Sequence, residues 1–232
     1  MFKRTGMIQR LVRDARGIAP QRWALLFGGF VGISLGAVMM IRAQVGLGPW
    51  DVLHQGISRQ TGISIGMASI LIAAPLMLGW LPLRERPGIG TLLNIVMIGL
   101  LIDLFMRFLP VATWLPVQLL QMAVGVVVLG TGAGLYLSAG MGAGPRDGLM
   151  MGLVRRTGRS VRLIRTLMEL TVLVVGWFMG GTVGIGTVAF ALGIGPVIQT
   201  TFQVLGTQPS PVRRVPDEAS VENAPLFTDK TI

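Results

Sequence analysis

The sequence predicts an all-α protein, a polytopic transmembrane helical bundle, and three observations support this fold class. Hydrophobic residues make up 52% of the 232 residues and charged residues only 13%, whereas a soluble domain carries about a quarter charged residues. The apolar residues lie in blocks of roughly twenty, long enough to cross a bilayer as helices. One motif also occurs twice at a constant offset, which indicates an internal duplication.

Six spans are expected, with a head before them and a tail after them. The spans fall at 22–41, 64–82, 89–109, 116–139, 161–179 and 185–205. Residues 1–21 are basic, with apolar residues at helical spacing, and are expected to form an amphipathic helix on an anionic inner leaflet. Residues 207–232 are polar and contain proline, so we expect a disordered tail. The membrane part divides into repeat 1, residues 22–110, and repeat 2, residues 111–206.

The duplicated motif reads Gly-Leu-Gly-Pro-Trp-Asp at residues 46–51 and Gly-Ala-Gly-Pro-Arg-Asp at residues 142–147. The same offset of 96 residues pairs Gly-Ile-Gly-Thr at 88–91 with the identical sequence at 184–187. Each copy holds three spans, an odd number. The second repeat is therefore expected to lie inverted across the membrane, an arrangement found in many transporters.

Within the motif, glycine and proline predict that one helix ends and a short one begins. The glycines allow backbone conformations that other residues avoid, and each proline suits the first position of a helix. We expect half-helices after spans 1 and 4; the first, from Trp50 to about Gln60, would be roughly 16 Å long. These half-helices are expected to line a pathway, or Asp51 and Asp147 serve as their caps, and both can hold together. The motif residues are Gly46, Gly48, Pro49, Gly142, Gly144 and Pro145.

Charged residues at membrane depth are costly and often mark a pathway. Four carboxylates and the single histidine are candidates for substrate binding or proton coupling, namely Asp51, Asp103, Asp147, Glu169 and His54. Local explanations stay open for some of them. Asp103 with Arg107, and Glu169 with Arg165, have the i,i+4 spacing of a helical ion pair. His54 is expected to be solvated at the interface, although a histidine could relay protons.

Small and amide side chains inside the spans predict helix packing. Gly28, Gly32 and Gly36 form a small-residue stripe in span 1, and Gly130 and Gly134 do the same in span 4. Such stripes allow close contact within the chain or between subunits, so a homo-oligomer is possible. Asn94 in span 3 is expected to make an interhelical hydrogen bond.

Charge and motif content exclude several function classes. With the N-terminus in the cytoplasm, 17 of the 20 Lys and Arg residues lie on the inner side and 3 outside, so both termini are expected to be cytoplasmic. This distribution favours membrane orientation over nucleic-acid binding. Because the sequence has no cysteine and only one histidine, we expect neither a metal site nor a cofactor. The sequence contains no catalytic motif, so we do not expect an enzyme.

The first motif copy, followed by Gly62-x-Ser64-x-Gly66 and by Gly88-Ile89-Gly90-Thr91, resembles the YczE/YyaS/YitT-like bacterial integral membrane proteins. The similarity covers about residues 22 to 205, and the second copy departs from the motif at Arg146. The resemblance implies a multi-span bacterial plasma-membrane protein whose activity is largely unassigned.

The predicted function is a small-solute transporter, permease or channel with a pathway between the two repeats, with the lipid bilayer and an unknown small solute as partners. The alternative is an accessory or regulatory membrane protein that binds another protein through its basic inner face and its tail.

Overall fold

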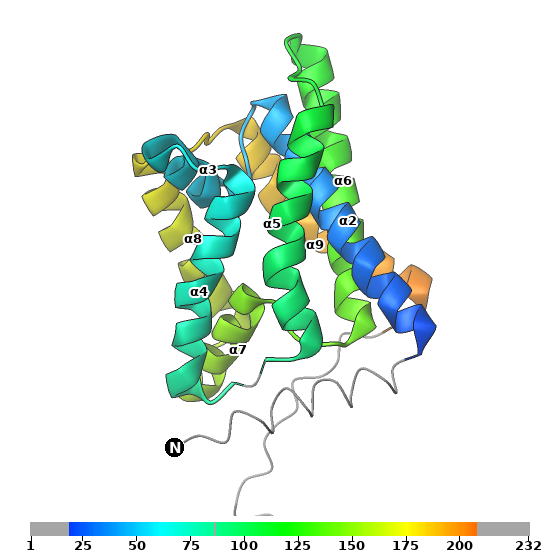
Figure 1. The fold of residues 1–232 in the computed structure, drawn as a ribbon, viewed down its shortest axis with the longest axis vertical. Helices are drawn as coiled ribbons and strands as arrows, with labels where there is room; N and C mark the ends of the chain where they lie inside the picture. The colour runs from blue at the N-terminus through cyan, green and yellow to red at the C-terminus, as the bar shows by residue number, and fades with distance from the viewer. Residues whose placement is uncertain (1–18, 86, 208–232) are drawn as a thin grey trace, which may run out of the picture.

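A computed structural model describes residues 19–85 and 87–207 of the chain. The helical regions have the bounds α2 Pro20–Ala43, α3 Pro49–Thr61, α4 Ile65–Leu83, α5 Ile89–Phe108, α6 Leu115–Ala139, α7 Pro145–Thr157, α8 Val161–Phe178 and α9 Ile185–Leu205. These described residues contain helices and no strands (Figure 1). The predictions of an amphipathic head and a disordered tail fall on residues that lie almost wholly outside the described ranges.

The long helices match the predicted spans to within two residues at each end. Within the described residues, five of them are long and apolar enough to cross a membrane: α2, α4, α5, α6 and α9. The sixth predicted span, α8, also forms a helix of 18 residues. It carries Arg162, Arg165 and Glu169, and these charges lower its hydropathy.

Helices α2 and α6 cross in the right-hand half of the bundle in Figure 1 and form its most extensive helix contact. Within the apolar 18-residue stretch of each helix, 50% of the residues are buried in α2 and 56% in α6. Only 22% are buried in α4, α5 and α9. Glycine makes the crossing possible. A Cβ on Gly36 would lie 2.4 Å from the backbone nitrogen of Leu129, and one on Gly132 would lie 2.4 Å from that of Ile33. The expected small-residue packing is therefore confirmed within the chain.

The individual glycines of the predicted stripes differ in how closely they pack. Gly32 contacts Gly132, and Gly130 and Gly134 contact Val197 and Thr201 of α9. Gly28 is different, because the nearest atom to a Cβ built on it would be a Leu135 side-chain atom 4.0 Å away.

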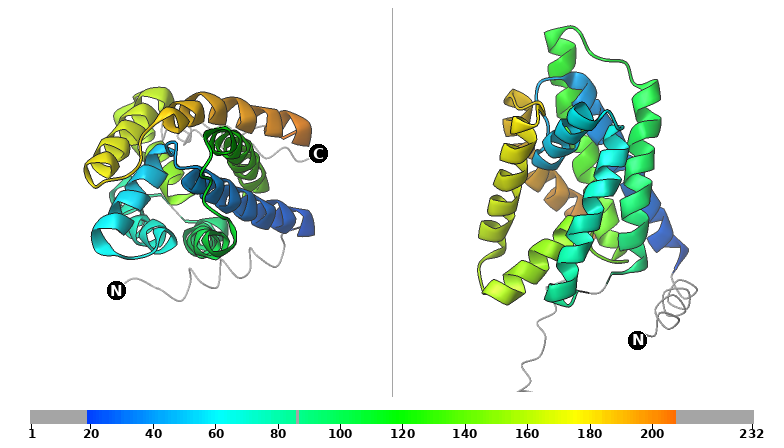
Figure 2. Two further views of the ribbon diagram at one scale, coloured as in Figure 1. Left: turned by 90° about the horizontal axis from the view of Figure 1, so that it is seen from above. Right: turned by 60° about the vertical axis from the view of Figure 1, so that its left-hand side comes forward.

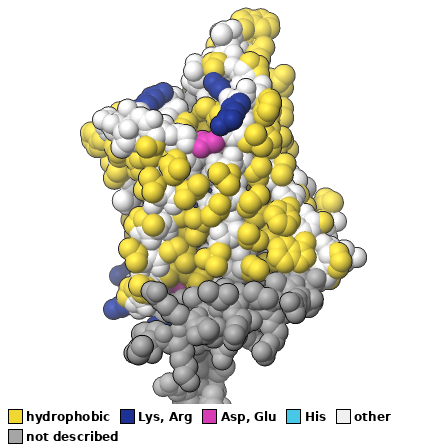
Figure 3. All heavy atoms as spheres, in the orientation of Figure 1, with side chains coloured by type: hydrophobic (Ala, Val, Ile, Leu, Met, Phe, Trp, Pro, Cys, Tyr) yellow, Lys and Arg dark blue, Asp and Glu magenta, His cyan; other side chains and the backbone are white. Residues whose placement is uncertain are grey.

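The sides of the bundle are covered by hydrophobic side chains, while Lys and Arg lie toward the two ends on the face seen in Figure 3. Leu78, Leu104, Leu120 and Leu192 are among the large apolar residues that are exposed. An apolar surface of this extent is stable in hydrocarbon and not in water. Helix α5 packs against α2 and helix α9 against α6, whereas α3, α4, α7 and α8 pack against one another to one side of this pair (Figure 2).

Two backbone hydrogen bonds join the halves of the chain reciprocally. The Val45 carbonyl, in the loop after α2, accepts from the Gly186 N–H at the start of α9, at 2.8 Å. The Met141 carbonyl, in the loop after α6, accepts from the Gly90 N–H at the start of α5, at 2.9 Å. Each partner in the second bond lies 96 residues from a partner in the first, so the contact is made twice in equivalent form.

Candidate functional site

The two motif copies form the two short helices, α3 and α7, each of 13 residues. Each begins with proline at its first turn and ends at a glycine with positive φ, Gly62 at 76° and Gly158 at 65°. Gly46 and Gly142 precede them with φ of 122° and 126°, a region where L side chains are strained. The predicted helix-stop and helix-start roles of the motif are thus confirmed.

The short helices pack across the halves of the chain. Helix α3 lies against α8, and α7 lies against α4. Both N-terminal ends line one cavity, which has a volume of about 190 Å³. This is smaller than the roughly 300–1,000 Å³ of pockets for drug-sized ligands, so its size suits a small solute or an ion.

The cavity wall is largely built from pairs of positions 96 residues apart. Every helix in the described ranges, from α2 to α9, contributes to it. The pairs are Ile33 and Leu129, Ala37 and Ala133, Gly48 and Gly144, Pro49 and Pro145, Trp50 and Arg146, Asp51 and Asp147, His54 and Met150, Ser69 and Arg165, Ile72 and Met168, Ala73 and Glu169, Asn94 and Phe190, Ile98 and Ile194, and Ile102 and Ile198. The cavity therefore lies between equivalent surfaces of the two halves.

On the α3 side, Asp51 faces His54. The carboxylate Oδ1 lies 3.7 Å from Nδ1 of His54, and both side chains are largely buried, at 15% and 11% exposed. The distance is too long for a hydrogen bond. Among the described residues, Nδ1 of His54 has no hydrogen-bond partner. The expectation of a solvated histidine is wrong: α3 packs against both α8 and α4, and all residues from Val52 to Gly56, His54 included, are buried.

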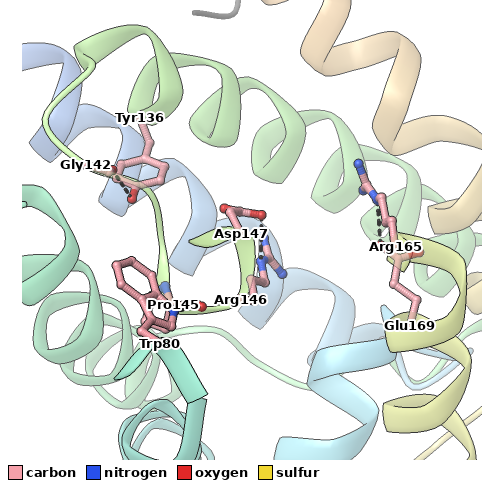
Figure 4. A network of polar contacts seen from close by, with 8 residues as sticks. All are labelled: Trp80, Tyr136, Gly142, Pro145, Arg146, Asp147, Arg165 and Glu169. Atoms are coloured by element: carbon pink, nitrogen blue, oxygen red, sulfur yellow. Dashed lines mark hydrogen bonds and ion pairs between the residues drawn. The ribbon is translucent and has the colours of Figure 1, made fainter. Parts of the chain in front are cut away.

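On the α7 side, Asp147 lies beside Arg146, with Nε of the arginine 3.9 Å from Oδ1 of the carboxylate (Figure 4). The hydroxyl of Tyr136 donates to the Gly142 carbonyl at 2.8 Å. Trp80 of α4 donates from Nε1 to the Pro145 carbonyl at 2.8 Å, which ties the start of α7 to α4 (Figure 4).

A third charged pair lies on α8. Nε of Arg165 donates to Oε1 of Glu169 at 2.9 Å, one helical turn apart (Figure 4). Both residues line the cavity. The local ion pair and a place on the cavity wall, which the sequence left as alternatives, occur together.

Asp103 is the predicted candidate that does not line the cavity. Its carboxylate accepts from the Ser64 hydroxyl at 2.5 Å and from the Gly66 N–H at 2.9 Å. Asp103 thereby satisfies a free N–H at the start of α4. Within the described ranges it has no ion pair with Arg107.

The carboxylates of Asp51 and Asp147 do not act as caps by hydrogen bonding. Neither accepts a hydrogen bond from a backbone N–H in the described part of the chain, and the N-cap positions are Gly48 and Gly144. Both aspartates still lie in the first helical turn, near the positive end of the helix dipole. Their carboxylates face His54 and Arg146 instead.

Sequence reasoning missed three features of the cavity. Tyr136 was not singled out, Asn94 was assigned to helix packing, and Arg146 was noted only as a departure from the motif. The signal that could have found them is the offset itself, since Asn94 and Phe190 are equivalent positions of different polarity. As for metals, the described residues contain no group of three or more His, Cys, Asp or Glu side chains that could hold an ion.

Long apolar helices and an apolar outer surface define the class: the protein is a multi-pass helical integral membrane protein. A family model described as "Family of unknown function (DUF6198)" matches residues 20–203. The chain belongs to this family.

Two relatives share 40% identity with the chain. An "Uncharacterized protein" of Haemophilus influenzae aligns over 177 residues, 76% of this chain and 81% of the relative. The "Uncharacterized membrane protein YczE" of Bacillus subtilis aligns over 181 residues, 77% and 84% respectively. The "Uncharacterized protein YyaS" of Bacillus subtilis is 28% identical over 163 residues, 68% and 81%.

These matches confirm the expected YczE/YyaS-like membrane family. The YitT part of the resemblance stays a prediction. No solved structure matches the chain.

Proposed function

We propose that the protein is a transporter or channel for a small solute in the bacterial plasma membrane, with six spans arranged as two inverted repeats. The pathway passes through the cavity between the repeats. The observation that carries this proposal is that the N-terminal ends of α3 and α7, with Asp51 and Asp147, line the same cavity. Discontinuous helices that point their ends at a shared site are typical of inverted-repeat transporters.

Three further observations support the proposal. The reciprocal hydrogen bonds of Val45 and Met141 are what a two-fold relation between the halves requires. Ionisable groups at membrane depth are retained in most proteins for a pathway or a site. The short helices contain backbone ends that only protein or water can cover at that depth.

Orientation has a direct test, because the sequence contains no cysteine. Thr61 and Thr157 are equivalent exposed residues at the ends of α3 and α7. A membrane-impermeant maleimide added to intact cells should label the Thr61→Cys variant, and it should label Thr157→Cys only after permeabilisation. Equal labelling of both variants from one side would contradict the inverted arrangement.

Transport is tested in proteoliposomes with a panel of potassium, methylammonium, acetate, alanine and glycerol. At least one probe should cross faster than in protein-free vesicles. The double variant Asp51→Asn with Asp147→Asn should lose this flux while keeping its circular dichroism spectrum and monodisperse elution. If the double variant shows the same flux as the unaltered protein, these carboxylates are not part of the pathway.

The alternative, an accessory protein that binds a partner through its basic residues, has less support, because two of these residues already have contacts within the chain. Arg155 forms an ion pair with Glu85, and Arg156 donates to the Pro82 carbonyl. Both contacts attach α7 to the end of α4. These arginines thus have partners inside the chain, which leaves transport as the better supported function.

A further inference from the structure

Each carboxylate on the cavity wall has one basic partner. Among the described residues, three carboxylates, two guanidinium groups and one imidazole line the cavity. The three pairs, with their nitrogen–oxygen distances, are Arg165 and Glu169 at 2.9 Å, Arg146 and Asp147 at 3.9 Å, and His54 and Asp51 at 3.7 Å. Two carboxylates are thus paired with arginine and the third with histidine.

The charges on the cavity wall balance only when His54 is protonated. Arginine keeps its proton in proteins, so two of the carboxylates always have a positive partner. Among the described residues, the carboxylate of Asp51 has no ion-pair partner other than His54. With a neutral imidazole, three carboxylates and two guanidinium groups leave one negative charge, and with an imidazolium the sum is zero. An unbalanced buried charge is costly, and His54 is the group that can remove it.

The pair of His54 and Asp51 is also the most buried of the three. Its side chains are 11% and 15% exposed, whereas each side chain of the two arginine pairs is at least 32% exposed. Solvent therefore screens the histidine pair least. Nδ1 of His54 has no hydrogen-bond partner in the described part of the chain. A bare Nδ1 would direct its lone pair at the carboxylate, so we expect Nδ1 to carry the hydrogen of the neutral ring and Nε2 to take up the added proton.

The helices packed against α3 bring few other ionisable groups toward His54. Helix α4 has none within its bounds. Helix α8 has Arg162, which does not line the cavity, and the bonded pair of Arg165 and Glu169, which does. On α3 itself, Arg59 lies in the last turn and donates to the Gly180 carbonyl. From α7, the arginine–aspartate pair lines the same cavity.

The equivalent positions of the second half have a different chemistry. The counterpart of His54 is Met150, which cannot be protonated, whereas the counterpart of Asp51 is again an aspartate. The positive charge beside that second aspartate comes from Arg146, the counterpart of Trp50. The two halves thus share the aspartate, with a permanent cation beside one copy and a titratable group beside the other.

We propose that His54 and Asp51 form a proton-binding site on the cavity, in which the imidazole takes up the proton and the carboxylate is its counter-ion. Histidine is the side chain whose charge ordinarily changes between about pH 5 and 8. This inference rests on the proposed function for its purpose, since the proton would be the coupling ion of transport. Binding of the proton is measurable in detergent, where no transport takes place.

The experiment observes the histidine ring directly, because the sequence contains one histidine. The full-length protein, with an affinity tag free of histidine, is labelled with nitrogen-15 in the imidazole ring and purified in detergent. Nuclear magnetic resonance spectra recorded from about pH 5 to about pH 9 should show one titrating ring, with its hydrogen on Nδ1 in the neutral form. A ring that stays in one protonation state over this range would overturn the proposal.

The carboxylate is tested by the Asp51→Asn variant. Loss of the negative charge 3.7 Å from Nδ1 should lower the proton affinity of His54 by about tenfold or more, measured as a shift of the titration midpoint. The matched variant Asp147→Asn removes the same charge from the other motif copy and should shift the midpoint much less. Equal shifts would show a general charge effect of the cavity and contradict the pairing of His54 with Asp51. Circular dichroism and monodisperse elution check the fold of both variants.

The coupling role is tested in proteoliposomes that contain a pH-sensitive dye. Addition of a probe solute that crosses should move protons across the membrane, and the His54→Gln variant should lose this movement. Flux of the probe without proton movement would overturn the coupling role and leave the proposed function intact. A titrating ring without flux of any probe would retain the proton site and argue against transport.

Discussion

The short helices α3 and α7 begin with the same motif but are held in the bundle by different contacts. Helix α3 rests directly on the backbone of α8: a Cβ on Gly176 would lie 2.5 Å from the backbone nitrogen of Leu53. Helix α7 is separated from the backbone of α4 by the indole of Trp80, which packs under Gly148. Trp80 and Gly176 are equivalent positions 96 residues apart.

A second contrast concerns the helices that follow. Helix α4 packs closely on α5, where Asp103 binds the start of α4 and Gly66 lies against Gly99. Helices α8 and α9 scarcely touch, and a Cβ on Gly195, the counterpart of Gly99, would meet no atom within 4 Å. Contacts between backbones permit little movement, whereas side chains can change rotamer. The duplicated framework is thus tightly joined at α3–α8 and α4–α5, and more loosely joined at α4–α7 and α8–α9.

The largest loss of stability is expected when the direct backbone contact between α3 and α8 is disrupted. In the Gly176→Val variant the added side chain would collide with backbone atoms of Leu53 and Val52. Overpacking typically costs about 1–3 kcal/mol, and backbone contact places this variant at about 3 kcal/mol or more. Thermal unfolding followed by size-exclusion chromatography measures the loss. Gly28→Val, where the nearest neighbour lies 4.0 Å away, is the control and should be much less destabilised.

Removing the Asp103 carboxylate should have the next largest effect. The Asp103→Ala variant loses two hydrogen bonds and leaves the Gly66 N–H without its partner. An unsatisfied group of this kind costs about 1–3 kcal/mol. Gln199 is the equivalent residue on the loosely packed side and is exposed. Gln199→Ala should change stability by no more than about 0.5 kcal/mol. Similar losses in both variants would contradict the difference between the α4–α5 and α8–α9 contacts.

A smaller effect is expected where α7 is held by a side chain. Trp80→Phe keeps an aromatic ring under Gly148 but removes the hydrogen bond to the Pro145 carbonyl. The expected cost is about 1 kcal/mol, as for a single buried hydrogen bond. Trp177→Phe on α8 serves as the comparison, because that tryptophan is 60% exposed. If the two variants unfold at the same temperature, the indole does not fix α7.

The smallest effect should come from Gly195→Ala. The added methyl group meets no neighbour, and alanine favours a helix over glycine by up to about 1 kcal/mol. Stability should stay unchanged or rise slightly. The same change at Gly99 would place a methyl group 2.6 Å from the Gly66 carbonyl oxygen and should lower the unfolding temperature. A loss at Gly195 equal to that at Gly99 would mean that α9 has a close neighbour there after all.

The long helices and the motif were predictable because their signals are local. Apolar length defines a span, and proline followed by a glycine 13 residues later defines the short helices. The offset of 96 residues also indicated which positions would be equivalent. None of these signals depends on how the helices cross.

The cavity was harder to predict, since it depends on contacts between distant segments. His54 is buried in a short helix that packs against both α8 and α4, and the sequence of the short helix alone does not show this. Asp103 has the spacing of an ion pair with Arg107, but the close approach of Gly66 and Gly99 brings the start of α4 within its reach. Tyr136 has no polar partner at any helical spacing, and its partner is the Gly142 carbonyl in the following loop.

The reciprocal bonds of Val45 and Met141 have a consequence for biogenesis. When α2 to α5 have left the ribosome, the Val45 carbonyl and the Gly90 N–H lack partners, which come from Gly186 and Met141. A backbone group that is buried without a hydrogen-bond partner costs about 1–3 kcal/mol. The early helices therefore reach their final arrangement only after the last helix has been translated and inserted. A nascent chain arrested before α9 should remain a substrate for membrane proteases.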